Sequence, residues 1–417
     1  MVTRNKHFLI SLLSFLFILQ NHSMIHAQYE PLAELWEVSV SEVPTLLTIE
    51  KNLILVDSIL TPILDNSSFG GTYISVKANK VFINTINSSM IPIIKASPKI
   101  QPYINLLSFK NATNSTFRLN SSFNELTTLA QNLKANNVMI GINPKFNNIV
   151  IYLNQKDNET NKNFIDSATK FYPIMNYSTS STNSTTLRSK IEERQIYERI
   201  LDGEGLHNIF GEQICSVGPL MKDNFNQFFY LTAGHCFANQ PLNPAGFVDF
   251  YHLPWYSPPT YDYIGQLEHY SISPYDFGLI HVINPIMLLS AIIKNNDYER
   301  YQELFIEDSA SVISVGVHLC KSGYTTHVTC GEVTELNAAI VTDFGTKIKL
   351  ETIVFDAISF EGDSGGPVYS NALHLEPFVT VVGIAINAIS SDDLDRTAAL
   401  PLDVVRRFFD LTLILTS

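Results

Sequence analysis

The sequence predicts two regions of different fold class: an α/β region in the first half, and an all-β region with a short C-terminal helix in the second. In the first half, pairs of short alternating segments are flanked by stretches with apolar residues at helical spacing. From Cys215 onward, short apolar runs are separated by Gly, Asn and Pro turns, which is typical of all-β domains. A polar, Ser/Thr/Asn-rich linker and processing region at 176–199 separates the two regions.

The chain begins with a segment that has the pattern of a secretory signal peptide. Arg4 and Lys6 precede an apolar run at 8–19, and a polar stretch then continues to Ala27. The run is too short to span a bilayer comfortably. We therefore expect 1–27 to be removed and the protein to be secreted to the extracellular medium, without membrane contact afterwards. An uncleaved anchor is the alternative.

Two similar units make up the region 28–175, and each is expected to hold a β-hairpin flanked by helices. The first unit has helical spacing over 30–64, strands at 72–76 and 81–86 and a helix from Ser89, and the second has a helix at 122–134, strands at 138–142 and 149–153 and a helix near 164–171. The helix at 122–134 places Leu126, Leu129 and Leu133 on one face. Neither unit contains a nucleophile motif, a metal-ligand cluster or a phosphate-binding loop.

Charge is divided unevenly between the two halves. Residues 1–199 carry 18 Lys and Arg against 14 Asp and Glu, a balance of +4, whereas 200–417 carry 9 against 26, a balance of −17, which together give −13. The acidic second half argues against nucleic-acid binding, which needs basic patches. The halves could dock through charge complementarity, or the acidic surface could simply keep the protein soluble.

Cysteines and glycosylation sequons fit a secreted protein. All four cysteines lie between 215 and 330, and an even number suits two disulfides in an oxidising compartment. A metal site is the rival use of these thiols, but their spacings match no zinc pattern, so we expect no metal and no cofactor. Sequons follow the signal at Asn66, Asn87, Asn111, Asn114, Asn120, Asn158, Asn176 and Asn183, so a glycosylating host would make a glycoprotein with sugar on the first half.

The stretch FEGDSGGPVY at 360–369 carries a specific chemical pattern. Gly362 and Gly365 allow the backbone to turn sharply, which lifts the Ser364 hydroxyl out of the surface. The amides of Gly362 and Ser364 can then point at an oxygen near that hydroxyl, which is the arrangement that acyl transfer requires. The alternative is a Gly-rich turn with an incidental serine.

A serine nucleophile needs a base, and the base needs a carboxylate that holds its tautomer. His235 in LTAGHCFA follows a predicted strand, and Gly234 and Cys236 can fix the turn that carries it. Asp276 in SPYDFGLIHV comes just before an apolar strand, where a charge is costly unless it is paired. A strand-edge aspartate that caps a turn is the alternative for this residue.

The motifs LTAGHC, YDFGLI and GDSGGP follow the order His, Asp, Ser, and in this the chain resembles the chymotrypsin-like serine proteases. The segment LCKSGYTTHVTCGEVTELNA is similar to the branch of α-lytic protease and the streptogrisins. GGTYISVKANKVFINTI and GINPKFNNIVIYL resemble the two hairpin units of the pro-regions in that branch. The resemblance implies a protease domain at 200–417, made of two six-stranded antiparallel β-barrels with a C-terminal helix, after an α/β pro-region at 28–175.

Carried over residue by residue, the resemblance implies a catalytic triad in the cleft between the barrels. Ser364 would be the nucleophile, His235 the general base and acid, and Asp276 the carboxylate that orients the imidazole. The amides of Gly362 and Ser364 would form the oxyanion hole.

The resemblance also implies how the domain is braced and matured. Cys215 would pair with Cys236 and Cys320 with Cys330, each disulfide adding about 2–4 kcal/mol to stability. The mature enzyme would begin at Ile200, after cleavage near Arg199–Ile200. The pro-region would dock on the protease domain, assist its folding and inhibit it until removal.

The strand VVGIAINAISS departs from the family pattern. The family usually has Ser-Gly-Gly where this chain, aligned on Gly383, has Ile386, Asn387 and Ala388. We expect Ala385, Ile386, Asn387 and Ala388 to bind substrate, without the serine hydroxyl that contacts Asp276 and with side chains at the pocket rim. No acid lies in 357–360 to bind a basic side chain, so a small or apolar residue is expected at the cleavage site.

These observations favour a secreted serine endopeptidase, made as a precursor, that hydrolyses proteins or peptides through a Ser-His-Asp triad and an acyl-enzyme. The altered Ile386–Ala388 segment motivates an alternative, a catalytically weak or inactive binding protein with a protease fold. A lipase or esterase fits neither the order nor the context of the motifs.

Overall fold

The computed structural model describes residues 30–179, 199–208, 211, 213–237, 240–256, 262–284, 289–297, 300–371, 377–391 and 394–416. The predicted signal peptide 1–27 and most of the predicted linker 176–199 lie outside the described residues. Within the described ranges, no helix is both long and apolar enough to cross a bilayer.

The first unit packs helices against a three-stranded sheet. Its main elements are α2 (Pro31–Trp36), α3 (Val43–Leu60), β1 (Phe69–Ser75), β2 (Lys80–Thr85), α4 (Ile91–Ala96) and β3 (Leu107–Asn111). β1 and β2 form the expected antiparallel hairpin, and β3 joins in parallel beside β2. Leu53, Val56 and Leu60 are buried along one face of α3. β3 was not predicted, since none of its residues is fully buried and its alternation is weak.

The second unit repeats this order of hairpin and parallel third strand. Its main elements are α5 (Thr116–Asn132), β4 (Val138–Asn143), β5 (Asn148–Asn154), α6 (Lys162–Ala168) and β6 (Ile174–Ser178). α5 begins before the predicted start because the Ser115 side chain caps it, accepting from the Arg118 amide at 3.3 Å. Its buried face holds Leu126 and Ala130, whereas Leu133, expected on that face, is exposed.

The second half confirms the predicted fold class, with β-sheet throughout its described ranges and one α-helix, α7 (Leu402–Arg406). The first barrel is an eight-stranded sheet in the order β22-β9-β10-β13-β12-β11-β7-β8. Its strands are β7 (Gly205–His207), β8 (Ile214–Ser216), β9 (Leu220–Asp223), β10 (Phe228–Thr232), β11 (Val248–Leu253), β12 (Tyr263–Ser271), β13 (Phe277–Val282) and β22 (Leu411–Leu413). This sheet has eight strands where six were expected. Three of them, β7, β8 and β22, are only three residues long.

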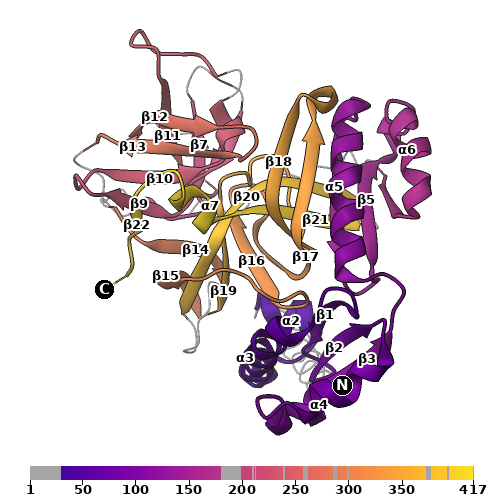
Figure 1. Cartoon of the computed structure of the whole chain (residues 1–417). Helices are drawn as coiled ribbons and strands as arrows, with labels where there is room; N and C mark the ends of the chain where they lie inside the picture. Colours follow the sequence, from indigo (N-terminus) through magenta and orange to yellow (C-terminus); the bar gives the residue numbers. More distant parts are fainter. Residues whose placement is uncertain are drawn as a thin grey trace, which may run out of the picture.

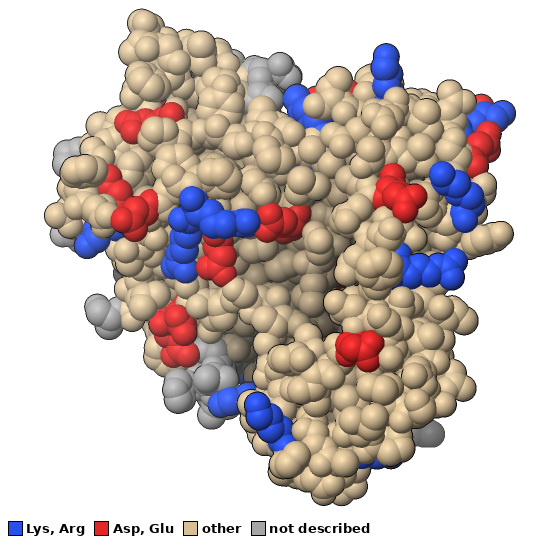
Figure 2. All heavy atoms as spheres, viewed as in Figure 1, with Lys and Arg blue, Asp and Glu red and all other residues tan. Residues whose placement is uncertain are grey.

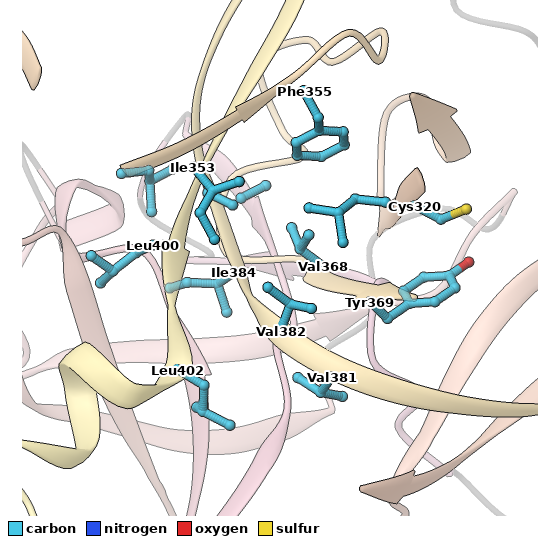
Figure 3. Close-up of a cluster of buried hydrophobic side chains, with 14 of the residues drawn as sticks. Cys320, Ile353, Phe355, Val368, Tyr369, Val381, Val382, Ile384, Leu400 and Leu402 are labelled. Carbon is cyan, nitrogen blue, oxygen red and sulfur yellow. The ribbon is translucent and has the colours of Figure 1, made fainter. Parts of the chain in front are cut away.

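The second barrel closes on itself, since its strands pair in the ring β16-β17-β18-β21-β20-β19 and back to β16. These strands are β16 (His318–Gly323), β17 (His327–Thr342), β18 (Lys347–Phe355), β19 (Pro367–Asn371), β20 (Phe378–Ser391) and β21 (Leu394–Pro401). Figure 3 shows Phe355, Val368 and Ile384, all fully buried, among the apolar side chains gathered inside this ring. The hairpin of β14 (Ile292–Asp297) and β15 (Tyr301–Ser309) extends the sheet beyond β20.

One hairpin, β17–β18, joins the two halves of the chain. β17 pairs antiparallel with β4, from Ala338 opposite Gly141 to Val341 opposite Val138, so the strands of the second unit continue the sheet of the second barrel. Ala339 and Val341 pack into the core of the second unit, while Ala338 and Ile340 face the larger core. Figure 1 shows α5 standing beside this hairpin.

Buried polar contacts accompany this pairing. Glu335 on β17 accepts from the Asn143 side chain and from the Tyr152 hydroxyl, both at 2.8 Å. Between the first unit and the second barrel, the buried Glu50 carboxylate lies 2.6 Å from Nδ1 of His318. Figure 2 shows Lys, Arg, Asp and Glu scattered over the visible face of the molecule instead of gathered in one basic patch.

The junction is expected to weaken as pH rises, because of Glu335. Burial raises the pKa of this carboxyl, and the hydrogen bonds from Thr334, Asn143 and Tyr152 offset the effect only in part. A carboxyl with a raised folded-state pKa adds its full stability below its unfolded pKa, about 4.3, and loses it as pH rises through the folded pKa. Glu335→Gln keeps a similar shape and removes the titration, so its melting temperature should rise relative to the unsubstituted chain as pH increases from about 4 to 8. Equal pH profiles in thermal unfolding would show that Glu335 does not titrate in this way.

Candidate active site

A fixed turn carries His235. The single turn Gly234–Phe237 follows β10 directly, and Cys236 within it is bonded to Cys215 on β8 with an S–S distance of 1.97 Å. A Cβ at position 234 would lie 1.9 Å from the Ser271 carbonyl oxygen and 2.6 Å from that of Phe277. The expected tight turn at Gly234 therefore has a more specific cause, the close approach of two neighbouring backbones.

Asp276 lies at the start of β13 with no exposed surface. Its Oδ2 accepts from Nδ1 of His235 at 2.7 Å, and its Oδ1 accepts from the backbone amide of His235 at 2.9 Å. With Nδ1 directed at the carboxylate, Nε2 of the ring remains the nitrogen that is not hydrogen-bonded within the described ranges. The carboxylate thus fixes both the position and the tautomer of the imidazole.

A lysine that was not predicted from the sequence also reaches Asp276. Nζ of Lys349, on β18, lies 2.6 Å from Oδ2 of Asp276 and donates to the carbonyl oxygen of Ile386 at 2.9 Å. Burial alone would raise the pKa of the Asp276 carboxyl, but the charges of Lys349 and His235 and their hydrogen bonds hold it well below its usual range. The carboxylate is therefore ionised at any physiological pH.

The loop that carries Ser364 is held by neighbouring backbones. Its two glycines have left-handed conformations, with φ of 104° at Gly362 and 92° at Gly365. A Cβ would lie 2.1 Å from the Thr325 hydroxyl at Gly362 and 2.2 Å from the Thr232 hydroxyl at Gly365. The Ser216 amide donates to the Ser364 carbonyl at 2.7 Å, which fixes the backbone at the serine itself. The expected turn around Ser364 therefore exists, and a side chain at either glycine would not fit.

Asp363, next to the serine, anchors the same loop from inside the barrel. Its buried carboxylate lies 3.1 Å from the buried Nζ of Lys321. It also accepts from the amides of Thr325 and Thr326, both at 2.9 Å, and of Phe360 at 3.0 Å. Burial would raise the pKa of Asp363, but Lys321 and these donors lower it, so the carboxylate stays charged. No local pattern marks Lys321 as a functional residue, because its contact with Asp363 joins two segments that are far apart in the sequence.

The proposed oxyanion donors have no competing partners. In the described part of the chain, the amides of Gly362 and Ser364 make no hydrogen bond, and neither does the hydroxyl of Ser364. His235 and Ser364 both line a cavity of about 630 Å³. Residues of the first half, among them Met139 and Ser178, line the same cavity from the opposite side. The imidazole of His235 and the hydroxyl of Ser364 thus border one space.

The four predicted substrate-binding residues also border this cavity, on β20. Ala385 and Ile386 are buried, whereas Asn387 and Ala388 are half-buried. The pairing of β20 with β21 shifts register between Ala385 and Asn387, so Ile386 stands outside the ladder. Side chains therefore border the cavity where the resemblance implied glycines, and the lysine contact replaces the missing hydroxyl contact to Asp276.

The cysteines form disulfides and offer no metal site. Cys215, Cys236 and His235 lie within ligand distance of one another, but both sulfurs are committed to a disulfide. A second disulfide joins Cys320 to Cys330 across β16 and β17, as the resemblance implied. Sulfurs in a disulfide are not thiolates, which are the form that binds metal.

The proposed processing bond lies at a well-packed position. The Arg199 guanidinium forms an ion pair with Glu303. The Ile200 side chain is fully buried, and its carbonyl accepts from the Ser290 hydroxyl at 2.6 Å. Cleavage at this bond therefore requires the segment to leave its present contacts, or to be cut before they form.

Part of the chain is similar to known proteins. Residues 224–392, which include His235, Asp276 and Ser364, match the family model described as Trypsin. Among solved structures, Protease A of Thermobifida fusca is 19% identical, over 52% of this chain and 100% of that chain, with a TM-score of 0.40. A Nocardiopsis protease is 18% identical, over 52% and 98%, with a TM-score of 0.41. An α-lytic protease homologue, N4, is 20% identical, over 52% and 100%, with a TM-score of 0.41.

Removing the buried cation at the serine loop should be strongly destabilising. Lys321→Met leaves the Asp363 carboxylate buried without its partner, so the free energy of unfolding should fall by about 3–5 kcal/mol in urea titrations. Lys222→Met, the same change on a half-buried strand residue of the first barrel, should stay within about 0.5 kcal/mol of the unsubstituted chain. Similar effects of the two substitutions would contradict the anchoring role of Lys321.

Proposed function

We propose that this chain, which carries a chymotrypsin-like serine protease domain, is a secreted serine endopeptidase made as an inactive precursor. One observation carries the proposal: a fully buried carboxylate holds the His235 imidazole at 2.7 Å, beside a cavity that Ser364 also lines. The signal-like segment at 1–27 and the two disulfides support secretion.

In the proposed reaction, Nε2 of His235 takes the proton from the Ser364 hydroxyl as the oxygen attacks a peptide carbonyl. Asp276 stabilises the imidazolium that forms. The amides of Gly362 and Ser364 donate to the carbonyl oxygen as it gains negative charge. His235 then protonates the leaving amine, and water hydrolyses the acyl-enzyme through the same groups.

The first half is proposed to act as the pro-region. Its β4 pairs with β17, and its Met139 and Ser178 line the cavity that His235 and Ser364 share. A segment in this position restricts access of a peptide to the serine. Its removal after folding would open the cavity, which is how a precursor of this design would be activated.

Substitution of the nucleophile tests the activity. Ser364→Ala and His235→Ala should each abolish labelling of the secreted protein by a fluorophosphonate and should lower peptide hydrolysis by on the order of 10⁶-fold. The first variant lacks the attacking oxygen, and the second lacks the base that activates it. Ser311→Ala is the matched control, since it removes an exposed hydroxyl that hydrogen-bonds Asp403 and is not among the residues lining the cavity. Secreted protein that is fully folded and correctly processed, yet unlabelled, would contradict the proposal and favour the binding-protein alternative.

The pro-region is tested by supplying it separately. Expression of 200–417 together with 28–199 should give more labelled enzyme than 200–417 alone, and added 28–199 should inhibit the mature enzyme. Asn143→Ala with Tyr152→Phe removes both hydrogen bonds to Glu335, so this variant should inhibit more weakly. Asn124→Ala, on the exposed face of α5, should inhibit as the unsubstituted region does. Equal yields and no inhibition would rule out a folding and inhibitory role.

A further inference from the structure

We propose that Lys349 is a positioning residue of the active site, which holds Asp276 in place and modulates the charge that Asp276 presents to His235. The inference rests on the proposed function of His235 and Ser364. Lys349 lies on a strand of the second barrel, whereas His235 and Asp276 both belong to the first barrel.

An irregularity in the β17–β18 pairing lies next to Lys349. Along the β17–β18 pairing, Ala338 lies opposite Thr352 but Ile340 lies opposite Lys349, so β18 contains an extra residue between the two pairs. Glu351, within this bulge, has a left-handed φ of 55°. A bulge re-aims the neighbouring side chains of a strand, and here it accompanies an inward-facing lysine.

The loop before Asp276 is bonded to the same bulge. The Leu350 amide donates to the Pro274 carbonyl at 2.9 Å, and the Tyr275 hydroxyl donates to the Glu351 carboxylate at 2.7 Å. The Ser273 hydroxyl donates to the Ile348 carbonyl at 2.9 Å. Residues on both sides of Lys349 are therefore bonded to the three residues before Asp276, which holds the two segments side by side.

The ammonium bridges two parts of the site. It lies 2.6 Å from Oδ2 of Asp276, the same oxygen that accepts from His235, and 2.9 Å from the carbonyl oxygen of Ile386 on β20. Its side chain is 10% exposed, so water screens the interaction little. Asp276 is thereby tied to the strand that we propose binds substrate, across the boundary between the two barrels.

A charged donor at this place differs from a neutral one. Any donor would satisfy the lone pair of Oδ2, but an ammonium also opposes the gain of positive charge by the nearby imidazole. Other charged groups that border the cavity are Lys156, Asp157, Asp343, Lys347 and Glu361. In the described ranges, Lys349 is the cation that forms an ion pair with Asp276 besides His235 itself.

The experiment measures the rate of fluorophosphonate labelling against pH for protein secreted from the full chain. Lys349→Met should lower the maximal rate about 10-fold and move the midpoint of the acid limb upward by about 1 pH unit. Lys349→Arg keeps the charge and should leave the midpoint within about 0.3 of the unsubstituted value. Lys349→Gln keeps a donor without the charge, so it should shift the midpoint as the methionine variant does.

Lys222→Met is the matched control, because it removes the same charge from a half-buried strand lysine that is not among the residues lining the cavity. Its acid limb should not move. If the methionine variant is not secreted, the comparison of Arg with Gln decides the question. Equal acid limbs for these two variants would overturn the inference while leaving the proposed protease intact. Absence of labelling in the unsubstituted protein would overturn both.

Discussion

The buried carboxylate of Asp276 is the constraint on which the active site depends. A charge with no exposed surface is stable only when cations and donors surround it, and each partner must come from a different part of the chain. The imidazole and amide of His235 come from the turn after β10, and the ammonium of Lys349 comes from β18. The contacts of this one carboxylate therefore join the two barrels. The same ion pairs and hydrogen bonds that stabilise the buried charge also hold the candidate site together.

A second buried carboxylate plays a similar part at Ser364, the proposed nucleophile. Asp363 is compensated by Lys321 on β16 and by amides of the turn after it, so the loop around Ser364 is held from within the second barrel. Each chemically important loop thus has a buried acid, a buried lysine and backbone donors. Removing one member of such a buried polar cluster lowers the free energy of unfolding more than removing an apolar contact of similar size does. Each cluster therefore favours a single conformation of the loop that it holds.

Local patterns made much of this arrangement predictable. The histidine, aspartate and serine each sit in a short segment whose glycines and neighbouring apolar residues define a turn beside a strand. The hairpins β1–β2 and β4–β5 were predictable for the same reason, because alternation and turn residues are close in sequence. Lys349 was not, since its contact with Asp276 depends on a bulge in β18 and on the closure of a barrel. The pairing of β17 with β4 also joins segments that no local pattern connects.

The pairing of β17 with β4 has a consequence for the proposed removal of the first half. At Ala338–Val341, β17 has β18 on one side and β4 on the other, and all four of its residues are buried. Once the first half departs, as proposed, these positions become an unpaired strand edge with small and β-branched side chains. Such an edge is a template for pairing with a further strand, including that of another copy. In the proposed precursor, the first half would therefore also cover an apolar strand edge, which the processed chain would leave exposed or cover again.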